Sequence, residues 1–528
     1  MSQSYFSEGL SITVLGASGD LAKKKTFPAL LDLFAHDLLP PHVVIVGYAR
    51  SAWTDDAFRD YLAKAIGGKA PDEITTKFLR RVSYCRGSYD SDSDFAVLAA
   101  QLTELELQSV DALKRNRMFY FAVPPNVFIP AAASIKTASV STAGWNRLIV
   151  EKPFGHDYDS ALRMSSQLTA LWEEESIYRI DHYLGKEMVQ NIMLFRFGNT
   201  FLEPLLNRNH VAAVQITFKE DFGTMGRGGY FDGYGIIRDI MQNHLMQVLS
   251  LIAMEPPVRV VGEDSATYVR NAKTNVLNSI PPLSIDDVVL GQYGPDNEGE
   301  NGGYLDDSTV PAGSQCPTFA VAHLKVRTPR WDGVPFILKA GKALDERKGE
   351  IRIQFKDAPA ASFMFERCEH DDVGGSCGGL SSHLPRNELV MKLQPEEVVY
   401  LKINVKTPGL VFDSTQSELD LSYNRRLYQG IYNPDAYTRL ILEALRGNQA
   451  PFVRSDELMA AWKIFSPLLT EIEEKAEAIA KGRPVADKYK PIVYPYGSRG
   501  PDEAEAFIKS TGMARTVGYK WSPPEEPK

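Results

Sequence analysis

The sequence predicts a two-domain protein with a doubly wound parallel α/β sheet followed by a β+α domain that contains a large, mainly antiparallel sheet. The chain has 528 residues, more than a single hydrophobic core usually serves. Its first third alternates short apolar runs with helical stretches, whereas the remainder contains runs in which apolar and polar residues alternate. We therefore predict one domain over residues 1–179 and a second over residues 180–528.

Parallel strands are predicted for apolar, β-prone runs that end at glycine, proline or a charged residue. These runs are residues 11–15, 43–47, 117–123 and 147–151, with helical segments at 20–36, 55–66 and 95–107. Strands that alternate with helices form βαβ units, in which the sheet is buried between helices. Such sheets bind ligands at the carboxyl ends of their strands, so the residues after each strand are candidate site residues.

The second half contains runs typical of antiparallel strands. They are residues 211–218, 320–327, 350–355, 388–393 and 398–405. Two turn-rich segments, 294–313 and 367–385, are expected on the surface. The second contains Cys368, Cys377 and His383, but their spacing does not fit a zinc site, so we expect no metal.

Composition excludes several classes of function. The formal charge of −9 argues against a nucleic-acid-binding surface, although a local basic pocket for an anion remains possible. The four cysteines form no CxxC pair, which suits a reducing compartment. No apolar run approaches the roughly 20 residues that a bilayer requires, and the N-terminus lacks the features of a signal peptide. These observations predict a cytoplasmic protein with small-molecule partners and no membrane association.

A glycine-containing turn lies between the first predicted strand and the first helix, where glycines allow the backbone to approach a pyrophosphate and the helix N-terminus offers free N–H groups. The spacing alone is weak, because glycine turns are common, but its position fits a Rossmann dinucleotide site. The candidate cofactor residues of the turn are Gly16, Ala17, Ser18, Gly19, Asp20 and Leu21.

The end of the second strand favours NADP over NAD. An NAD site usually has an acidic residue there, whereas this chain has Arg50 and Ser51, a cation and a hydroxyl suited to a 2′-phosphate. A solvated loop arginine is the alternative. Pro124 after the third strand and Lys152 after the fourth lie at the same predicted edge of the sheet, which directs Lys152 toward the nicotinamide end.

A second candidate site begins at Asp181. His182, Tyr183 and Lys186 supply the hydrogen-bond donors that a phosphate dianion needs, although a helix cap beside a core histidine is an equally simple interpretation.

Polar residues interrupt a mostly apolar helix further along the chain. Asp239 and Asn243 are four residues apart and would share one face of an α-helix, with His244 beside them. Oxidation of an alcohol requires a base, and an imidazole suits that role at neutral pH. We predict His244 as the base and Asp181 as the carboxylate that orients it. For a lone histidine, a hydrogen bond to a backbone carbonyl in the core would be the simpler explanation.

Together these segments resemble the glucose-6-phosphate dehydrogenase family. The matching motifs are residues 16–25, 47–51, 151–155, 179–187, 238–244, 303–307, 341–344 and 496–501, and they occur in the family's order over nearly the whole chain. The resemblance implies a Rossmann domain followed by a β+α domain, assembly into homodimers or homotetramers, and oxidation of β-D-glucose 6-phosphate at C1 by NADP⁺ to 6-phospho-D-glucono-1,5-lactone, the first step of the oxidative pentose phosphate pathway.

The resemblance also assigns roles by motif position. His244 would be the base, Asp181 would orient it, and Lys152 would contact both substrate and cofactor. The 6-phosphate would be bound by His182, Tyr183 and Lys186, and the sugar by Glu220, Asp239 and Lys342, with Arg347 and Gln394 nearby.

Two other functional classes fit parts of the sequence. Sugar and inositol oxidoreductases also place Glu-Lys-Pro after a Rossmann domain, but they lack the block at residues 179–186. A non-enzymatic NADP-binding sensor would have no need for His244, Asp181 and the phosphate-binding residues together.

Overall fold

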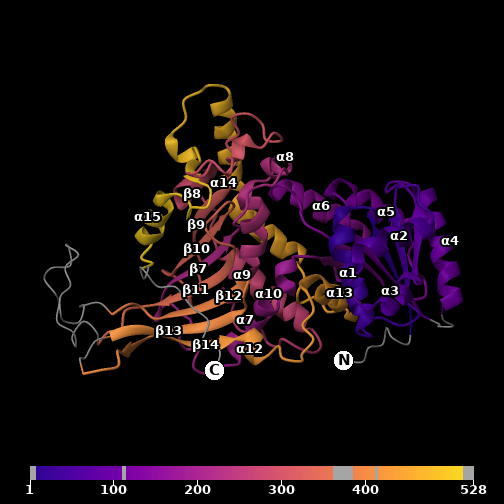
Figure 1. The fold of residues 1–528 in the computed structure, drawn as a ribbon, viewed down its shortest axis with the longest axis horizontal. Coiled ribbons are helices and arrows are strands. Elements are labelled where there is room, and N and C mark those ends of the chain that lie inside the picture. The colour runs from indigo at the N-terminus through magenta and orange to yellow at the C-terminus, as the bar shows by residue number, and fades with distance from the viewer. Residues whose placement is uncertain (1–7, 110–113, 361–383, 411–413, 515–528) are drawn as a thin grey trace. The chain divides into compact units, whose positions relative to one another are not determined.

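The computed structural model describes residues 8–109, 114–360, 384–410 and 414–514 (Figure 1). The predicted surface loop that contains Cys368, Cys377 and His383 lies mainly outside these ranges. The chain forms two compact units: the first comprises residues 1–191, 246–278 and 432–466, and the second comprises residues 192–245, 279–431 and 467–528. The division into domains at residue 180 stays a prediction.

A six-stranded parallel sheet forms the centre of the first unit, with the strand order β3-β2-β1-β4-β5-β6. Its strands are β1 (Gly9–Leu15), β2 (Val44–Ala49), β3 (Val82–Arg86), β4 (Arg115–Phe121), β5 (Asn146–Val150) and β6 (Ile177–Arg179). The order reverses between β1 and β4, which is the switch point where doubly wound sheets bind ligands. The predicted fold class is confirmed, although the sequence did not reveal β3 and β6.

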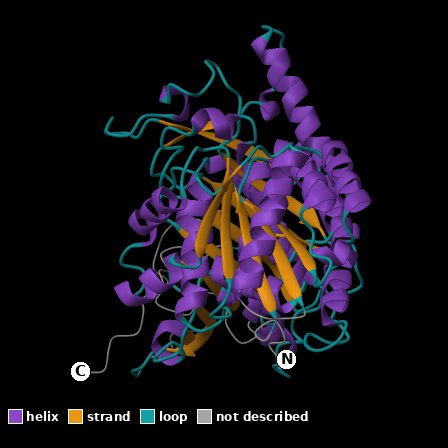
Figure 2. Ribbon diagram, turned by 90° about the vertical axis from the view of Figure 1, so that its right-hand side faces the viewer, coloured by secondary structure: helices purple, strands orange, loops and turns teal. Residues whose placement is uncertain are grey.

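Helices cover both faces of this sheet (Figure 2). The helices before residue 191 are η2 (Ala22–Thr26), α1 (Phe27–Ala35), α2 (Asp55–Ile66), α3 (Asp72–Leu79), α4 (Asp92–Ser109), η3 (Pro125–Val127), α5 (Phe128–Ala138), α6 (Tyr158–Leu171), η4 (Glu174–Ser176) and η5 (His182–Gly185); α7 (Glu187–Phe197) crosses the boundary between the units. Later in the chain come α9 (Met246–Ala253), α10 (Ser265–Asn278), α13 (Ala436–Arg446) and the start of α14 (Ser455–Ala480).

The sheet is buried on both faces, which explains why its strands are continuous apolar runs. Ile12 and Val14 of β1 belong to one hydrophobic cluster with residues of α1, α2 and α13. Leu15 belongs to a second cluster with residues of α4, α5 and α6. The two clusters together hold the strand ends in place.

A nine-stranded sheet forms the centre of the second unit, in the order β14-β13-β12-β11-β7-β10-β9-β8-β15 (Figure 1). Its strands are β7 (Val211–Lys219), β8 (Val288–Gly294), β9 (Phe319–Lys325), β10 (Pro335–Gly341), β11 (Lys348–Phe355), β12 (Glu388–Gln394), β13 (Val398–Lys406), β14 (Ser414–Ser422) and β15 (Ile492–Pro495). Neighbours are antiparallel except for β7 with β10 and β8 with β15. The mainly antiparallel sheet is therefore confirmed.

The helices of the second unit are mostly short. They are α8 (Gly228–Asp232), η6 (Ile237–Leu245), η7 (Ile285–Asp287), η8 (Tyr304–Asp306), α12 (Tyr423–Arg426), η9 (Asp487–Tyr489) and α15 (Asp502–Ser510), together with the end of α14. Within the described ranges, no helix combines the length and apolarity that crossing a bilayer requires.

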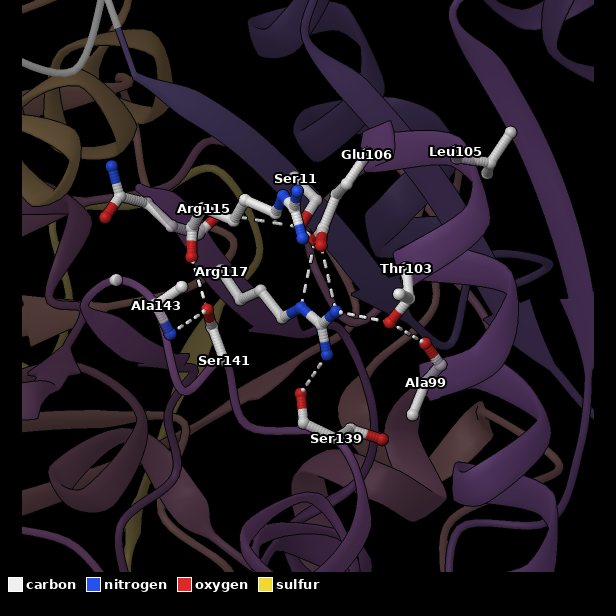
Figure 3. A network of polar contacts seen from close by, with 12 residues as sticks. Ser11, Ala99, Thr103, Leu105, Glu106, Arg115, Arg117, Ser139, Ser141 and Ala143 are labelled. Atoms are coloured by element: carbon white, nitrogen blue, oxygen red, sulfur yellow. Dashed lines mark hydrogen bonds and ion pairs between the residues drawn. The ribbon is translucent and has the colours of Figure 1, made fainter. Parts of the chain in front are cut away.

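A buried ion pair joins α4 to the parallel sheet (Figure 3). Arg117 of β4 donates from Nε and from a terminal nitrogen to the two carboxylate oxygens of Glu106, each at 2.9 Å. Ser11 of β1 donates to the same carboxylate at 2.7 Å, and Arg117 also donates to the Ser139 carbonyl at 2.9 Å. Because both charged side chains are buried, the removal of either leaves its partner uncompensated.

We expect Glu106→Gln to lower the stability of the first unit by about 3–5 kcal/mol, since the Arg117 charge would stay buried without its counter-ion. Differential scanning calorimetry measures this as a lower unfolding temperature. The control is Glu73→Gln, which removes an exposed pair with Lys77 (2.6 Å) and should leave the transition unchanged. Equal transitions for the two variants would contradict the prediction.

Candidate active site

The turn after β1 has a backbone that only glycine adopts easily. Gly16 has φ +77°, and a Cβ there would lie 2.2 Å from the Ala122 carbonyl oxygen. Its N–H donates to the Tyr48 carbonyl of β2 at 2.8 Å, and the Gly19 N–H donates to the Gly16 carbonyl at 2.8 Å. The turn is thus held between the ends of β2 and β4, with the helical segment beginning at Asp20. This compact cradle at the switch point fits the pyrophosphate of a dinucleotide.

The residues after β2 meet this turn. Ser51 donates from its hydroxyl to the Ser18 hydroxyl at 3.2 Å, so two predicted cofactor residues from different loops are in contact. Arg50 is exposed, and its guanidinium lies 5.8 Å from the centroid of the Tyr89 ring. An exposed cation that is followed in the chain by a serine hydroxyl fits a 2′-phosphate. The sequence did not predict Tyr89 as a neighbour of the cofactor site, because nothing in the sequence distinguishes it from other aromatic loop residues.

The other predicted cofactor residues occupy the same turn or the same sheet edge. Asp20 is exposed and pairs with Lys24 at 2.6 Å, and Leu21 is half-buried at the start of the helix. Pro124 is exposed after β4, and Lys152 is half-buried after β5. Both therefore lie at the carboxyl edge of the parallel sheet.

The predicted phosphate-binding segment forms the 3₁₀ helix η5. Asp181, only 3% exposed, caps this helix by accepting a hydrogen bond from the Tyr183 N–H at 3.0 Å. The His182 ring is stacked on Tyr437 of α13, with 6.0 Å between centroids, and the Lys186 amine lies 4.9 Å from the centroid of the Tyr183 ring. Close packing on α13 explains Gly185, where a Cβ would lie 2.5 Å from the Ala436 carbonyl oxygen. Asp181 therefore acts as a helix cap. Its predicted role as the carboxylate that orients His244 stays a proposal.

Three predicted sugar-binding residues converge in the second unit. Lys342 follows β10 and Glu220 follows β7, and these neighbouring strands are parallel, with Gly341 opposite Lys219. The Lys342 amine forms an ion pair with Glu220 and lies 3.9 Å from the Asp239 carboxylate of η6. The Tyr494 hydroxyl donates to the Lys342 carbonyl at 2.8 Å and holds this strand end from β15. The cluster offers carboxylate acceptors and an ammonium donor, the groups that bind sugar hydroxyls.

The helix that carries Asp239 and His244 is a π-helix over Ile237–Leu245, followed directly by α9. In a π-helix the hydrogen bonds run from residue i to i+5, so each turn is wider than the α-helical turn assumed for Asp239 and Asn243. Their shared face stays a prediction. The Asn243 side chain instead donates to the Arg238 carbonyl at 3.1 Å and accepts from the His244 N–H at 2.6 Å. His244 is buried, and π-helical turns are frequent at functional sites.

Arg347 and Gln394 lie at the same edge of the large sheet as Glu220. Lys348, the neighbour of Arg347, pairs with Lys219 at the end of β7, and Gln394 pairs with Gly349. Arg347 is exposed and Gln394 is half-buried. The described residues therefore place both predicted residues at the sheet edge where Lys342 and Glu220 meet.

A parallel sheet with a glycine cradle at its switch point is the arrangement of a dinucleotide-binding domain. Residues 13–191 match the family model described as glucose-6-phosphate dehydrogenase, NAD binding domain, and residues 193–522 match the model of the C-terminal domain of the same family. The chain therefore belongs to the glucose-6-phosphate dehydrogenase family.

Individual relatives support this assignment over nearly the full length. "Glucose-6-phosphate 1-dehydrogenase 5, cytoplasmic" of Arabidopsis thaliana is 49% identical over 98% of this chain and 94% of its own length. The glucose-6-phosphate 1-dehydrogenase of Dictyostelium discoideum is 47% identical over 97% of this chain and 96% of its own length. A solved structure described as glucose-6-phosphate dehydrogenase in complex with its substrate glucose-6-phosphate has a TM-score of 0.85 and 43% identity, over 97% of this chain and 99% of that one.

These similarities confirm the predicted family, the fold class and the class of enzyme, an NADP-dependent dehydrogenase that oxidises a sugar phosphate. They also confirm the predicted function, oxidation of glucose 6-phosphate. The roles of the individual site residues stay predictions.

We expect Arg50→Ala to weaken NADP⁺ binding roughly tenfold to hundredfold, since a hydrogen bond to a charged group contributes about 1.5–3 kcal/mol. NAD⁺ binding should change little, because NAD⁺ lacks the 2′-phosphate. Titration of both cofactors by calorimetry measures the two dissociation constants. Arg80→Ala, at an exposed arginine after α3, is the matched control, and an equal loss of NADP⁺ and NAD⁺ binding in Arg50→Ala would contradict the assignment.

Proposed function

We propose that His244 accepts the C1 hydroxyl proton while β-D-glucose 6-phosphate is oxidised to 6-phospho-D-glucono-1,5-lactone. Bound NADP⁺ supplies the hydride acceptor for this reaction. The observation that carries the proposal is the position of His244 on the π-helix, five residues after Asp239, whose carboxylate lies 3.9 Å from the Lys342 amine. A sugar that is hydrogen-bonded by the Asp239 carboxylate and the Lys342 amine would lie close to the His244 imidazole.

An imidazole suits the base role because the ordinary pKa of a histidine side chain, near 6.5, lies close to neutral pH. Asp181, in this proposal, stabilises the imidazolium that forms and fixes the ring tautomer, as the carboxylate of a catalytic triad does. The burial of both side chains supports the assignment, because a charge that develops in a buried site depends strongly on a nearby opposite charge.

The remaining predicted residues bind the substrate. Lys186 and His182 lie at the two ends of η5 and supply hydrogen-bond donors for the 6-phosphate, together with the Tyr183 hydroxyl. Glu220, Asp239 and Lys342 bind sugar hydroxyls, with Arg347 and Gln394 at the same sheet edge. Lys152, at the end of β5, contacts both the substrate and the cofactor.

We expect His244→Asn to lower kcat/KM by roughly 10² or more, as the loss of a general base predicts. The measurement is absorbance at 340 nm with NADP⁺ and glucose 6-phosphate, beside galactose 6-phosphate and unphosphorylated glucose as substrate controls. His323→Asn, at a half-buried histidine of β9, is the matched variant and should retain activity.

Two outcomes would overturn the proposal. Wild-type protein that turned over no glucose 6-phosphate would refute the reaction, whereas full activity in His244→Asn would refute only the base.

We also propose that the chain assembles as a homodimer or homotetramer through the large sheet and acts in the cytoplasm. The edge strand β14 carries Leu419 at 60% exposure, and exposed edge strands are ready to pair with another chain. The Arabidopsis relative is named as a cytoplasmic form. Light scattering on the purified protein tests the assembly, with a monomer mass as the contradicting result, and cell fractionation tests the location.

A further inference from the structure

A buried carboxylate lies directly beside Lys152. Glu151 follows β5 and is 5% exposed, although it carries an acidic group at the end of an apolar strand. The Tyr120 hydroxyl of β4 donates to its carboxylate at 2.5 Å. β4 and β5 are parallel neighbours, so the tyrosine and the glutamate meet at the same edge of the sheet as the cofactor turn.

The charges around Glu151 come from several elements of the first unit. The Lys152 ammonium and a hydrogen bond from the Lys152 N–H favour its carboxylate form, as does the Tyr120 hydroxyl. Asp181, after β6, opposes this form as a like charge. The charges of Glu151 and Asp181 also act on Tyr437 of α13 and raise its pKa further above its usual range. Thr26 of η2 interacts with the Tyr120 hydroxyl. Burial exceeds all these effects and raises the pKa of Glu151 to about 7.

Among the described residues, no arginine is one of the groups that interact with this acid, in contrast to Glu106 of α4, which pairs with Arg117. Among the described side chains, the neutral Tyr120 hydroxyl and the neighbouring Lys152 ammonium stabilise the Glu151 carboxylate. The charge of Glu151 therefore lies next to Lys152. The resemblance to the family implies that this lysine contacts both substrate and cofactor. A purely structural role would be served better by an apolar residue, because a partly compensated buried acid costs stability.

We propose that Glu151, held by the Tyr120 hydroxyl, is a titratable positioning residue for Lys152. Its carboxylate fixes the Lys152 ammonium at the end of β5, and its protonation loosens that ammonium. The inference rests on the proposed function, because it takes Lys152 as a residue of the reaction. It adds a second ionisation to the pH dependence, next to that of the base.

The sign of the effect follows from the charge. Below pH 7 Glu151 is increasingly protonated, and a protonated glutamate and a glutamine are both neutral and nearly isosteric. Above pH 7 the wild type gains a carboxylate that Glu151→Gln cannot form. The ratio of kcat/KM between the wild type and Glu151→Gln should therefore rise from near one at pH 5.5 to about tenfold at pH 8.5, the effect of roughly one pKa unit of charge interaction.

Tyr120→Phe provides an independent variant. It keeps the acid but removes a donor to the carboxylate, so the midpoint of the Glu151 ionisation should move to higher pH rather than disappear. The control is Glu471→Gln in the second unit, which removes the charge from an acid that also accepts a 2.5 Å hydrogen bond from a tyrosine, Tyr489. Its ratio to the wild type should stay constant with pH.

The experiment measures kcat/KM from pH 5.5 to 8.5 for the four proteins, with circular dichroism as the check on folding. A ratio that rises with pH for Glu151→Gln and a shifted midpoint for Tyr120→Phe support the inference. A ratio independent of pH in an active enzyme overturns it while leaving the proposed function intact, whereas an inactive wild type refutes the proposed function. If Glu151→Gln does not fold, an unshifted midpoint in Tyr120→Phe overturns the inference.

Discussion

Parallel strand pairing fixes where the chemistry of this protein lies, because neighbouring strands that run in the same direction end at the same edge of a sheet. In the first unit, β1, β2 and β5 lead into the Gly16 turn, Arg50 and Lys152. In the second unit, the parallel pair of β7 and β10 brings Glu220 to Lys342. An antiparallel neighbour in place of β10 would have sent its end to the opposite edge, and this ion pair would not form.

The same constraint explains what the sequence predicted well. Each functional segment of the first unit follows an apolar run, and such runs are easy to recognise when both faces of a strand are buried. Gly16 was recognisable because a close backbone approach tolerates no side chain, and the structure gives that reason, a carbonyl oxygen 2.2 Å from any Cβ. The contact of Ser51 with Ser18 then follows from the pairing of β1 with β2.

Pairing between distant segments was harder to predict. The run Pro335–Gly341 is as apolar as the parallel strands of the first unit, but the sequence does not show that it pairs with β7, more than a hundred residues earlier. The sequence also did not reveal that the helix with Asp239 and Asn243 is a π-helix rather than an α-helix with 3.6 residues per turn. Tyr120 gave no signal, since a hydroxyl inside an apolar strand has the same pattern as phenylalanine.

Two buried acids of the first unit show how the partners of an acid decide whether it serves the fold or the reaction. Glu106 receives two hydrogen bonds from a buried guanidinium and one from Ser11, so its charge is matched within the protein. Burial raises the pKa of Glu151 to about 7. Its carboxylate accepts a hydrogen bond from the Tyr120 hydroxyl, is attracted by the Lys152 ammonium and is repelled by Asp181. A buried acid paired with an arginine serves the fold, because the removal of either partner destabilises it. The weaker compensation of Glu151 leaves its charge sensitive to pH near neutrality. Because the second acid lies at the edge where the strands end, that change occurs where it can act on the reaction.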